Sequence, residues 1–174
     1  MLDRCARGQY AEKHMRILGI DPGLTTTGIG LLDVQGKTMT ALDWLTLTTD
    51  PANVLTDRLR ELSEDFEAIL NDMRPDLAVV EQIFFANNAK TVLAVAHARG
   101  VLLATLGRRA IPVIEATPMQ LKSVVTGDGS ADKRQIGAML CMMLHLPKAP
   151  APADAADALA LAVYGALKHS QPTH

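Results

Sequence analysis

The chain has 174 residues, of which 48% are hydrophobic, so its length and composition fit one domain with a sizeable core. Its formal charge is −2, and its two cysteines, Cys5 and Cys141, have no metal-like spacing and suggest no disulfide framework. The sequence shows no signal peptide and no run of about 20 apolar residues, which predicts a cytoplasmic protein without a membrane span.

Three strands are predicted near the start of the chain. Residues 15–20, "MRILGI", form a continuous apolar run that is typical of a strand buried on both faces, and residues 26–34 follow after a turn with glycines that a hairpin tolerates. Residues 37–49 alternate well enough to be a third strand, which completes an antiparallel meander. Residues 1–14 and 170–174 are expected to be flexible ends.

A helix and a parallel strand are predicted next. Asp50 and Pro51 supply an N-cap and a first helical residue, and apolar residues then recur at helical spacing up to Met73. Residues 76–82 are typical of a short buried strand. We expect this strand to lie parallel in the sheet, because a crossover helix precedes it.

The second half of the chain is predicted to contain four helices and one strand. Their expected ranges are a long apolar helix over about 88–106, a strand over 111–116, a helix over 117–125 with Thr117 as its cap, a helix from Ser130 to Pro147, and a terminal helix ending near 169. The resulting order describes a single α/β domain over residues 15–169. Its sheet is mixed and five-stranded, with three antiparallel and two parallel strands, and helices flank it.

Charge is distributed unevenly along the sequence. Residues 31–80 contain four Lys or Arg against ten Asp or Glu, whereas residues 86–149 contain eight against three. The second half therefore has the balance of a cationic face that meets phosphates, with ordinary surface variation as the alternative.

Two carboxylates end predicted buried strands. Asp21 follows "RILGI" and precedes a Pro-Gly pair, and Glu81 follows the four apolar residues "LAVV". A carboxylate in such a place has a burial cost unless a cation meets it. Considered separately, Asp21 is also explained as a turn residue, and Glu81 as a strand-end residue that faces water.

Asp154 and Asp157 are three residues apart in the predicted terminal helix, so their carboxylates share one face. Stabilisation of a helix N-terminus explains either residue alone. Placed over the ends of the two strands, the pair would gather four carboxylates, an all-oxygen ligand set that suits Mg²⁺. Two such ions about 4 Å apart activate water and stabilise the leaving oxygen in phosphodiester cleavage.

Five segments extend this interpretation. They are "ILGIDPGLTTTGIG", "AVVEQIFFANNAKT", "AHARGV", "TPMQLKSVVTGDGSADK" and "PADAADALALA". In order and spacing they resemble the signature segments of the RuvC-type Holliday junction resolvases, within the ribonuclease H-like superfamily, from Met15 to His169. The resemblance implies an endodeoxyribonuclease that resolves four-way DNA junctions by paired symmetric nicks, in homologous recombination and DNA repair.

The resemblance also implies site residues and a cofactor. Its four catalytic, metal-binding acids fall on Asp21, Glu81, Asp154 and Asp157. Asp21 would serve both of two Mg²⁺ ions, for which Mn²⁺ is an expected substitute, and Asp154 matches the more variable position.

Basic and aromatic residues near the acids are candidates for DNA contact. Lys122 and Lys133 match basic positions that resemble those used near the scissile phosphate, and Phe84 matches the family's junction-stacking aromatic. Weaker candidates for contacts with the DNA backbone are Lys90, Arg108, Arg109 and Arg134. The alternatives are solvated surface lysines and, for Phe84 and its neighbour Phe85, anchors in the core.

A homodimer is expected because a four-way junction has near-two-fold symmetry and needs matched nicks on opposed strands. The apolar helix over 88–106 is the expected interface, although burial within the monomer would explain its composition equally well. A branch-migration complex of RuvA and RuvB is implied by the family alone.

Three other functions stay open from the sequence alone. Phosphate-binding ATPases of the sugar kinase, actin and chaperone superfamily also begin with "GIDxG" and threonines, but they need two such domains. A catalytically silent junction-binding module is a second alternative, which the full set of acids disfavours. A related RNA-processing nuclease is the third, and the segments "FFANNA" and "DAADALA" favour the resolvase.

Overall fold

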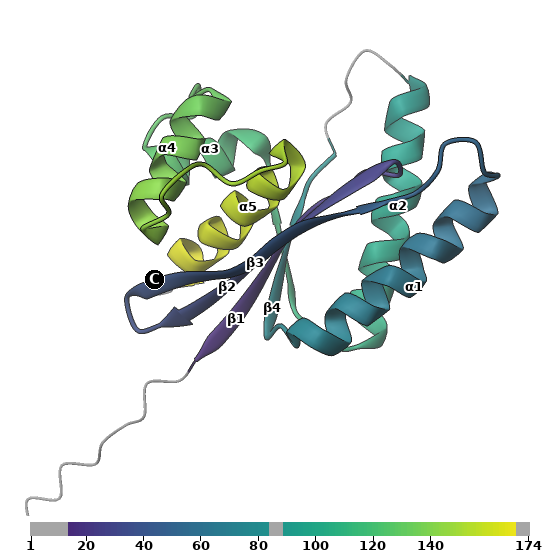
Figure 1. Ribbon diagram of the computed structural model, residues 1–174, viewed down its shortest axis with the longest axis horizontal. Helices are drawn as coiled ribbons and strands as arrows, with labels where there is room; N and C mark the ends of the chain where they lie inside the picture. The colour runs from purple at the N-terminus through teal and green to yellow at the C-terminus, as the bar shows by residue number, and fades with distance from the viewer. Residues whose placement is uncertain (1–13, 84–88, 170–174) are drawn as a thin grey trace, which may run out of the picture.

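The computed structural model describes residues 14–83 and 89–169, and Figure 1 shows a twisted sheet with helices on both faces. The predicted flexible ends therefore lie outside the described residues, apart from His14. In chain order the elements are β1 (Met15–Asp21), β2 (Thr26–Gln35), β3 (Thr38–Thr48), α1 (Leu55–Met73), β4 (Leu77–Glu81), α2 (Ala89–Arg108), β5 (Val113–Ala116), α3 (Pro118–Thr126), α4 (Lys133–Leu144) and α5 (Ala153–His169).

The sheet has the order β3-β2-β1-β4-β5, with β1 at its centre. The first three strands are antiparallel, and β4 runs parallel to both β1 and β5. This confirms the predicted mixed sheet of three antiparallel and two parallel strands. In the parallel ladders Ile20 pairs with Val80, and Glu81 pairs with Ala116, so β1 and β4 end side by side.

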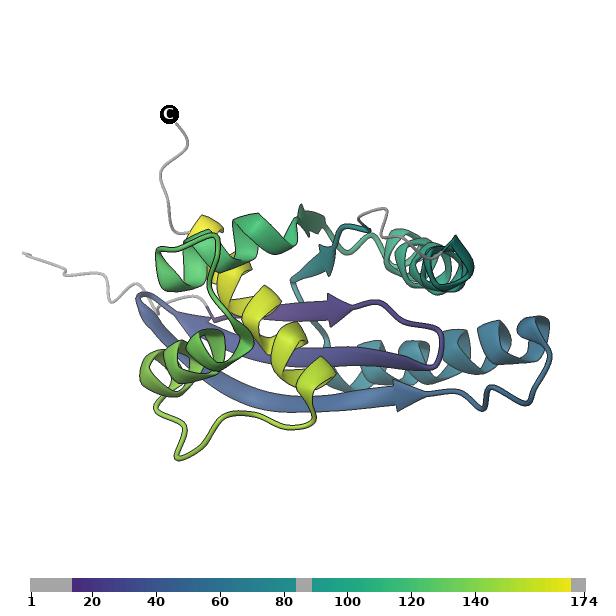
Figure 2. The same ribbon diagram turned by 90° about the horizontal axis from the view of Figure 1, so that it is seen from above.

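Two helical layers cover the sheet. The helices α3, α4 and α5 lie on one face and α1 and α2 on the other (Figures 1 and 2). Because side chains alternate along a strand, Ile17 and Val79 belong to the core under α5, whereas Leu18 and Val80 belong to the core under α1 and α2. Each strand of the sheet centre is therefore buried on both faces, as its apolar sequence predicts.

Glycines in β1 and β2 let α5 lie unusually close to the sheet. A Cβ atom at Gly19 would overlap the carbonyl oxygen of Ala158, and a Cβ atom at Gly28 would overlap the carbonyl oxygen of Asp154. The sequence explains Gly28 as a residue that a hairpin tolerates, but in the structure both glycines make room for the backbone of a packed helix.

The beginnings of two helices differ from the predictions. Helix α1 begins at Leu55, not at Pro51, because Asp50 accepts a hydrogen bond from the amide of Ala52 (2.8 Å) in a separate turn. Helix α4 is capped by Asp132, which accepts from the Gln135 amide, and not by Ser130.

Two other helix ends are informative. Helix α4 ends at Leu144, before the predicted Pro147, since His145 takes up a left-handed conformation that stops the helix. The predicted cap of α3 is confirmed: Thr117 accepts from the Gln120 amide and Pro118 opens the helix.

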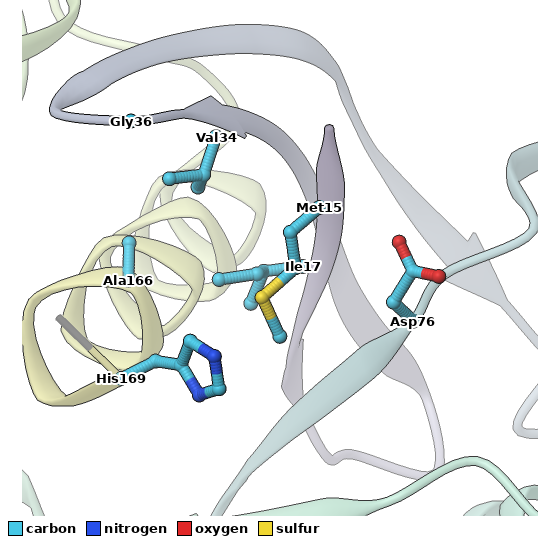
Figure 3. Close-up of a pocket in the computed structure, with 7 residues that line it drawn as sticks. All are labelled: Met15, Ile17, Val34, Gly36, Asp76, Ala166 and His169. Atoms are coloured by element: carbon cyan, nitrogen blue, oxygen red, sulfur yellow. The ribbon is translucent and has the colours of Figure 1, made fainter. Parts of the chain in front are cut away.

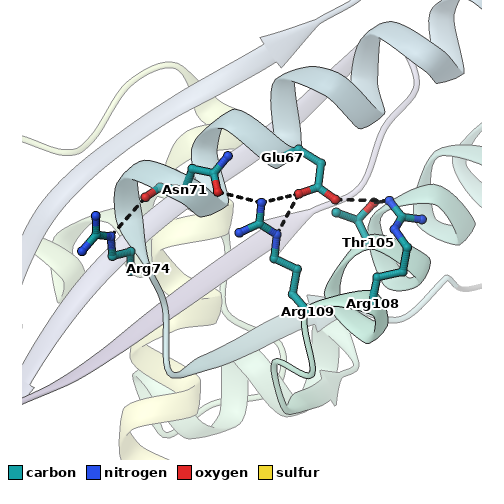
Figure 4. A network of polar contacts seen from close by, with 6 residues as sticks. All are labelled: Glu67, Asn71, Arg74, Thr105, Arg108 and Arg109. Atoms are coloured by element: carbon teal, nitrogen blue, oxygen red, sulfur yellow. Dashed lines mark hydrogen bonds and ion pairs between the residues drawn. The ribbon is translucent and has the colours of Figure 1, made fainter.

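A polar clamp joins α1 to α2 at the edge where β4 begins (Figure 4). Glu67 accepts from Arg109 at 2.7 Å and from Arg108 at 3.3 Å, and Arg109 also donates to Asn71. The hydrogen bond from Arg109 holds the pKa of Glu67 below its usual value. Arg108 and Arg109, two of the weaker candidates for DNA contact, are thus engaged in a contact between helices.

Candidate active site

Two of the four predicted acids lie at the ends of neighbouring parallel strands. Asp21 is the last residue of β1 and Glu81 the last residue of β4. Asp21 has the same strand parity as Ile17, and Glu81 the same parity as Val79, so both side chains face α5. The sheet thereby presents two carboxyl groups at one point of its edge.

Helix α5 supplies the other two acids. Asp154 and Asp157 lie in its first two turns, and both are half-buried. The close approach at Gly28, which pairs with Asp21 across β1 and β2, brings the first turn of the helix down onto the end of the sheet. A residue with a side chain at this position would hold the helix away from Asp21.

The four carboxyl groups gather in one cluster. Single carboxylate oxygens of Asp21, Asp154 and Asp157 all lie within 4.8 Å of one another. The Glu81 carboxyl group lies beside that of Asp21, since burial and then the charge of Glu81 raise the pKa of Asp21. The acids that the sequence predicts to meet therefore lie close together in space. Their roles in metal binding and catalysis stay a prediction.

The pKa values reflect how crowded the cluster is. Burial, and then the charges of Glu81 and Asp157, raise the pKa of Asp21 to about 8. Burial and the charge of Asp157 also raise the pKa of Glu81. Without a cation, some carboxyl groups of the cluster thus stay protonated at physiological pH. This is typical of an acidic site that binds a cation.

Lys133 is the one predicted basic residue that the described structure brings to the acids. Its ammonium group donates to Asp157 at 2.7 Å, from the first residue of α4. This bond, and the charges of Asp157, Asp21 and Asp154, raise the pKa of Lys133. Lys133 therefore stays protonated beside the cluster.

Threonines outside the cluster shape the turn that follows Asp21, and sequence analysis missed their role. Thr27 is fully buried and donates to the carbonyl of Gly23 at 2.6 Å. Thr49 donates to the carbonyl of Leu24 at 2.5 Å and accepts from Arg58. The run of threonines near a Pro-Gly pair was the available signal, because such a turn needs side chains to satisfy its carbonyls.

The remaining predicted residues make no described contact with the acids or lie outside the described residues. Lys122 lies on α3, and hydrogen bonds from Ser130, followed by the charge of Lys122, lower the pKa of Asp128. Arg134 is exposed next to Lys133 on α4. Phe84 and Phe85 lie outside the described residues. For Lys90 the structure describes the helical backbone but not the side chain.

The donor set of the carboxyl cluster suits a divalent cation. Its donors are all carboxylate oxygens, the ligands that hard cations such as Mg²⁺ prefer. Desolvation and mutual repulsion raise the pKa of Asp21, which means that its ionised form is disfavoured, and a bound cation would stabilise that form.

A cavity of about 450 Å³ lies elsewhere, where β1 begins and α5 ends. It is lined mainly by apolar side chains such as Met15, Ile17 and Val34 (Figure 3).

The raised pKa of Asp21 gives a pH dependence for stability. Between its unfolded value of 3.8 and its folded value of about 8, the folded protein binds more protons than the unfolded chain. We therefore expect the free energy of unfolding of the metal-free protein to fall as pH rises from about 5 to about 8. The expected fall is smaller for Asp21→Asn, which cannot ionise.

Urea unfolding of both proteins in a chelator, at several pH values, measures this difference. Parallel pH profiles for the parental protein and Asp21→Asn would contradict the shifted pKa.

Known proteins resemble this chain over most of its length. The family described as "Crossover junction endodeoxyribonuclease RuvC" matches residues 17–165. A protein of that description from Parafrankia sp. is 43% identical over 150 residues, which cover 86% of this chain and 84% of the relative. One from Salinispora arenicola is 45% identical over 150 residues, which cover 86% of each chain.

Solved structures agree. The structure described as "T. thermophilus RuvC in complex with Holliday junction substrate" superposes with a TM-score of 0.85 at 31% identity, over 90% of this chain and 95% of the other. The structure of that protein therefore contains a Holliday junction, which is named there as its substrate.

Proposed function

Because this chain belongs to the RuvC family of crossover junction endodeoxyribonucleases, we infer that it is an endonuclease that resolves Holliday junctions. We further propose that it cuts two opposed strands symmetrically, by phosphodiester hydrolysis with two divalent ions. The family membership disfavours the phosphate-binding ATPase and the silent binding module that the sequence leaves open.

The observation that carries the metal proposal is the convergence of three carboxylates within 4.8 Å, with Glu81 near enough that its charge adds to burial in raising the pKa of Asp21. Acids this close repel one another strongly unless a cation lies between them. A divalent metal is the cation class that fits. The choice of Mg²⁺, the count of two ions, and Mn²⁺ as a substitute are parts of the proposal.

The chain's own residues have distinct proposed roles. Asp21, Glu81, Asp154 and Asp157 would hold the ions, and Asp21 would give up its proton as they bind. Bound at such a site, two divalent ions supply an activated water and stabilise the leaving oxygen. Lys133, held at Asp157, is placed to balance negative charge at a phosphate that approaches the cluster.

Contacts with the junction are proposed for residues around the cluster. Lys122 and Arg134 lie on α3 and α4, the helices on the same face of the sheet as α5 (Figure 1). Arg134 is exposed beside Lys133, so it is free to reach a phosphate. Lys90 and Phe84 are retained as candidates from the sequence alone.

Phe84→Ala is expected to weaken junction cleavage more than it weakens binding to linear duplex DNA. Loss of a stacked base costs about 1 to 3 kcal/mol, or roughly 5-fold to 150-fold. Cleavage rates on a junction and filter binding to a matched duplex measure the two effects. An equal loss on both substrates would contradict a stacking role for Phe84.

A homodimer is proposed with α2 as its interface. This helix exposes a row of apolar and small residues, Leu93, Ala96, Gly100 and Ala104, along one side. Leu93 is 59% exposed, which is unusual for a leucine on a packed helix. Such a row lets a second copy approach closely. Light scattering of the purified chain tests the oligomeric state.

The partnership with a RuvA–RuvB branch-migration complex and a cytoplasmic location are proposed on the basis of the family alone. Among the described residues, no helix has the length and apolar character of a membrane span.

A labelled four-way junction and a linear duplex of the same sequence test the function. We expect cleavage of the junction at paired, opposed positions when Mg²⁺ is present, and little cleavage of the duplex. Equal cleavage of both substrates, or no cleavage with Mg²⁺, would contradict junction resolution. Hydrolysis of ATP by the same preparation would favour the ATPase alternative.

A further inference from the structure

Arg99 supports the end of β4 from the side of the sheet opposite the acids. It lies on α2, and its side chain is only 17% exposed. Its Nε donates to the backbone carbonyl of Glu81 at 3.1 Å, and its Nη2 donates to the Glu115 carboxylate at 2.7 Å. One guanidinium thus joins α2 to β4 and β5.

The carbonyl that Arg99 binds belongs to Glu81, the last residue of β4, where the pairing of this strand with β1 has ended. The ladder between β1 and β4 ends at the pair of Ile20 and Val80, one residue before Glu81. On the other side the ladder continues, since Glu81 pairs with Ala116. The last peptide of the strand therefore has sheet neighbours on one side only, and the bond from Arg99 restrains it.

That peptide controls the direction of the Glu81 carboxyl group. The side chain points toward α5, whereas Arg99 acts from the α2 side, so Arg99 touches none of the carboxyl oxygens of the cluster in any described contact. A ligand must stay within about 0.5 Å and 10–20° of its working position, and a backbone restraint of this kind supplies such precision.

Glu115 in turn orients Arg99. An arginine–carboxylate bond at 2.7 Å is charge-assisted and directional. It fixes the guanidinium plane so that Nε faces the Glu81 carbonyl. The chain Glu115, Arg99 and Glu81 is therefore one connected unit across two strands and a helix.

We propose that Arg99 is a positioning residue for Glu81, which it holds for metal binding through the backbone carbonyl, with Glu115 orienting Arg99. The inference rests on the proposed function in taking Glu81 as a metal ligand. Removal of a group that orients a ligand costs about 10-fold to 100-fold in metal affinity. The expected loss is at the lower end, because Arg99 acts through the strand and not on the carboxylate itself.

The test uses the full chain with Arg99→Met and Glu115→Gln. The matched control is Arg60→Met, which removes an exposed arginine paired with Glu64 on α1 and changes the net charge equally. Calorimetric titration with Mn²⁺, on protein without DNA, should show about 10-fold weaker binding for Arg99→Met and a smaller loss for Glu115→Gln. Arg60→Met should bind Mn²⁺ as the parental protein does.

A second readout separates positioning from DNA contact and from misfolding. The Mg²⁺ concentration for half-maximal cleavage should rise in Arg99→Met, while junction binding without metal and the circular dichroism spectrum stay at parental values. Parental Mn²⁺ affinity in both variants would overturn the proposal, and so would a loss of junction binding as large as the loss of cleavage. Failure of the parental protein to cleave junctions would overturn the proposed function instead, because the Mn²⁺ titration does not depend on cleavage.

Discussion

Asp21→Asn is expected to abolish junction cleavage while leaving junction binding intact. The change keeps the size of the side chain but removes a carboxyl group of the cluster that can ionise when a cation binds. Metal ions contribute several kcal/mol of transition-state stabilisation, so the cleavage rate should fall about 1000-fold or more. Junction binding without metal should stay close to parental, because a pKa of about 8 already keeps Asp21 mostly neutral near pH 7.

Single-turnover cleavage with saturating enzyme and a gel-shift titration measure the two quantities for Asp21→Asn. Asp43→Asn is the matched control, since Asp43 is an exposed acid on β3 that accepts from the Trp44 amide. Its cleavage rate should be parental. Residual cleavage near the parental rate in Asp21→Asn would refute the metal-ligand role of this residue.

Gly28→Ala is expected to damage the site although it replaces none of the four acids. The added methyl group would overlap the backbone of Asp154, which cannot move as a flexible side chain can. The first turn of α5 must therefore shift away from Asp21. A displacement of about 1 Å in a catalytic group can cost about 100-fold in rate, and overpacking costs about 1 to 3 kcal/mol of stability.

Gly107→Ala is the control for this substitution, because a Cβ atom at Gly107 has nothing within 4 Å. In a helix, alanine is favoured over glycine by about 0.5 to 1 kcal/mol, so the control should be slightly more stable and fully active. Urea unfolding and cleavage at a temperature where both proteins are folded give the comparison. Parental cleavage by Gly28→Ala would show that the close approach of α5 is not needed.

Much of the fold could be predicted because the core imposes simple patterns. The apolar runs of β1 and β4 predict strands buried on both faces, and the crossover helix predicts their parallel pairing. The first residues of the helices are harder to predict. Asp50 followed by proline fits a cap equally well as a turn, and only the tertiary structure decides that α1 begins at Leu55.

The site could be predicted only in part. The positions of Asp21 and Glu81 follow from strand ends, and the spacing of Asp154 and Asp157 follows from helix geometry. What brings them together is the glycine-lined contact of α5, which no local pattern shows. The role of Arg99 depends on contacts with residues 16 and 18 positions away in the chain, so sequence spacing gives no sign of it.

The central claim is that side chains from β1, β4 and α5 bind divalent ions together. A crystal of the protein soaked in Mn²⁺, with data collected at the manganese absorption edge, tests it most directly. We expect anomalous peaks at about 2.1 Å from carboxylate oxygens of Asp21, with further ligands from Glu81, Asp154 or Asp157. No peak at this cluster, with manganese bound only elsewhere on the protein, would contradict the account.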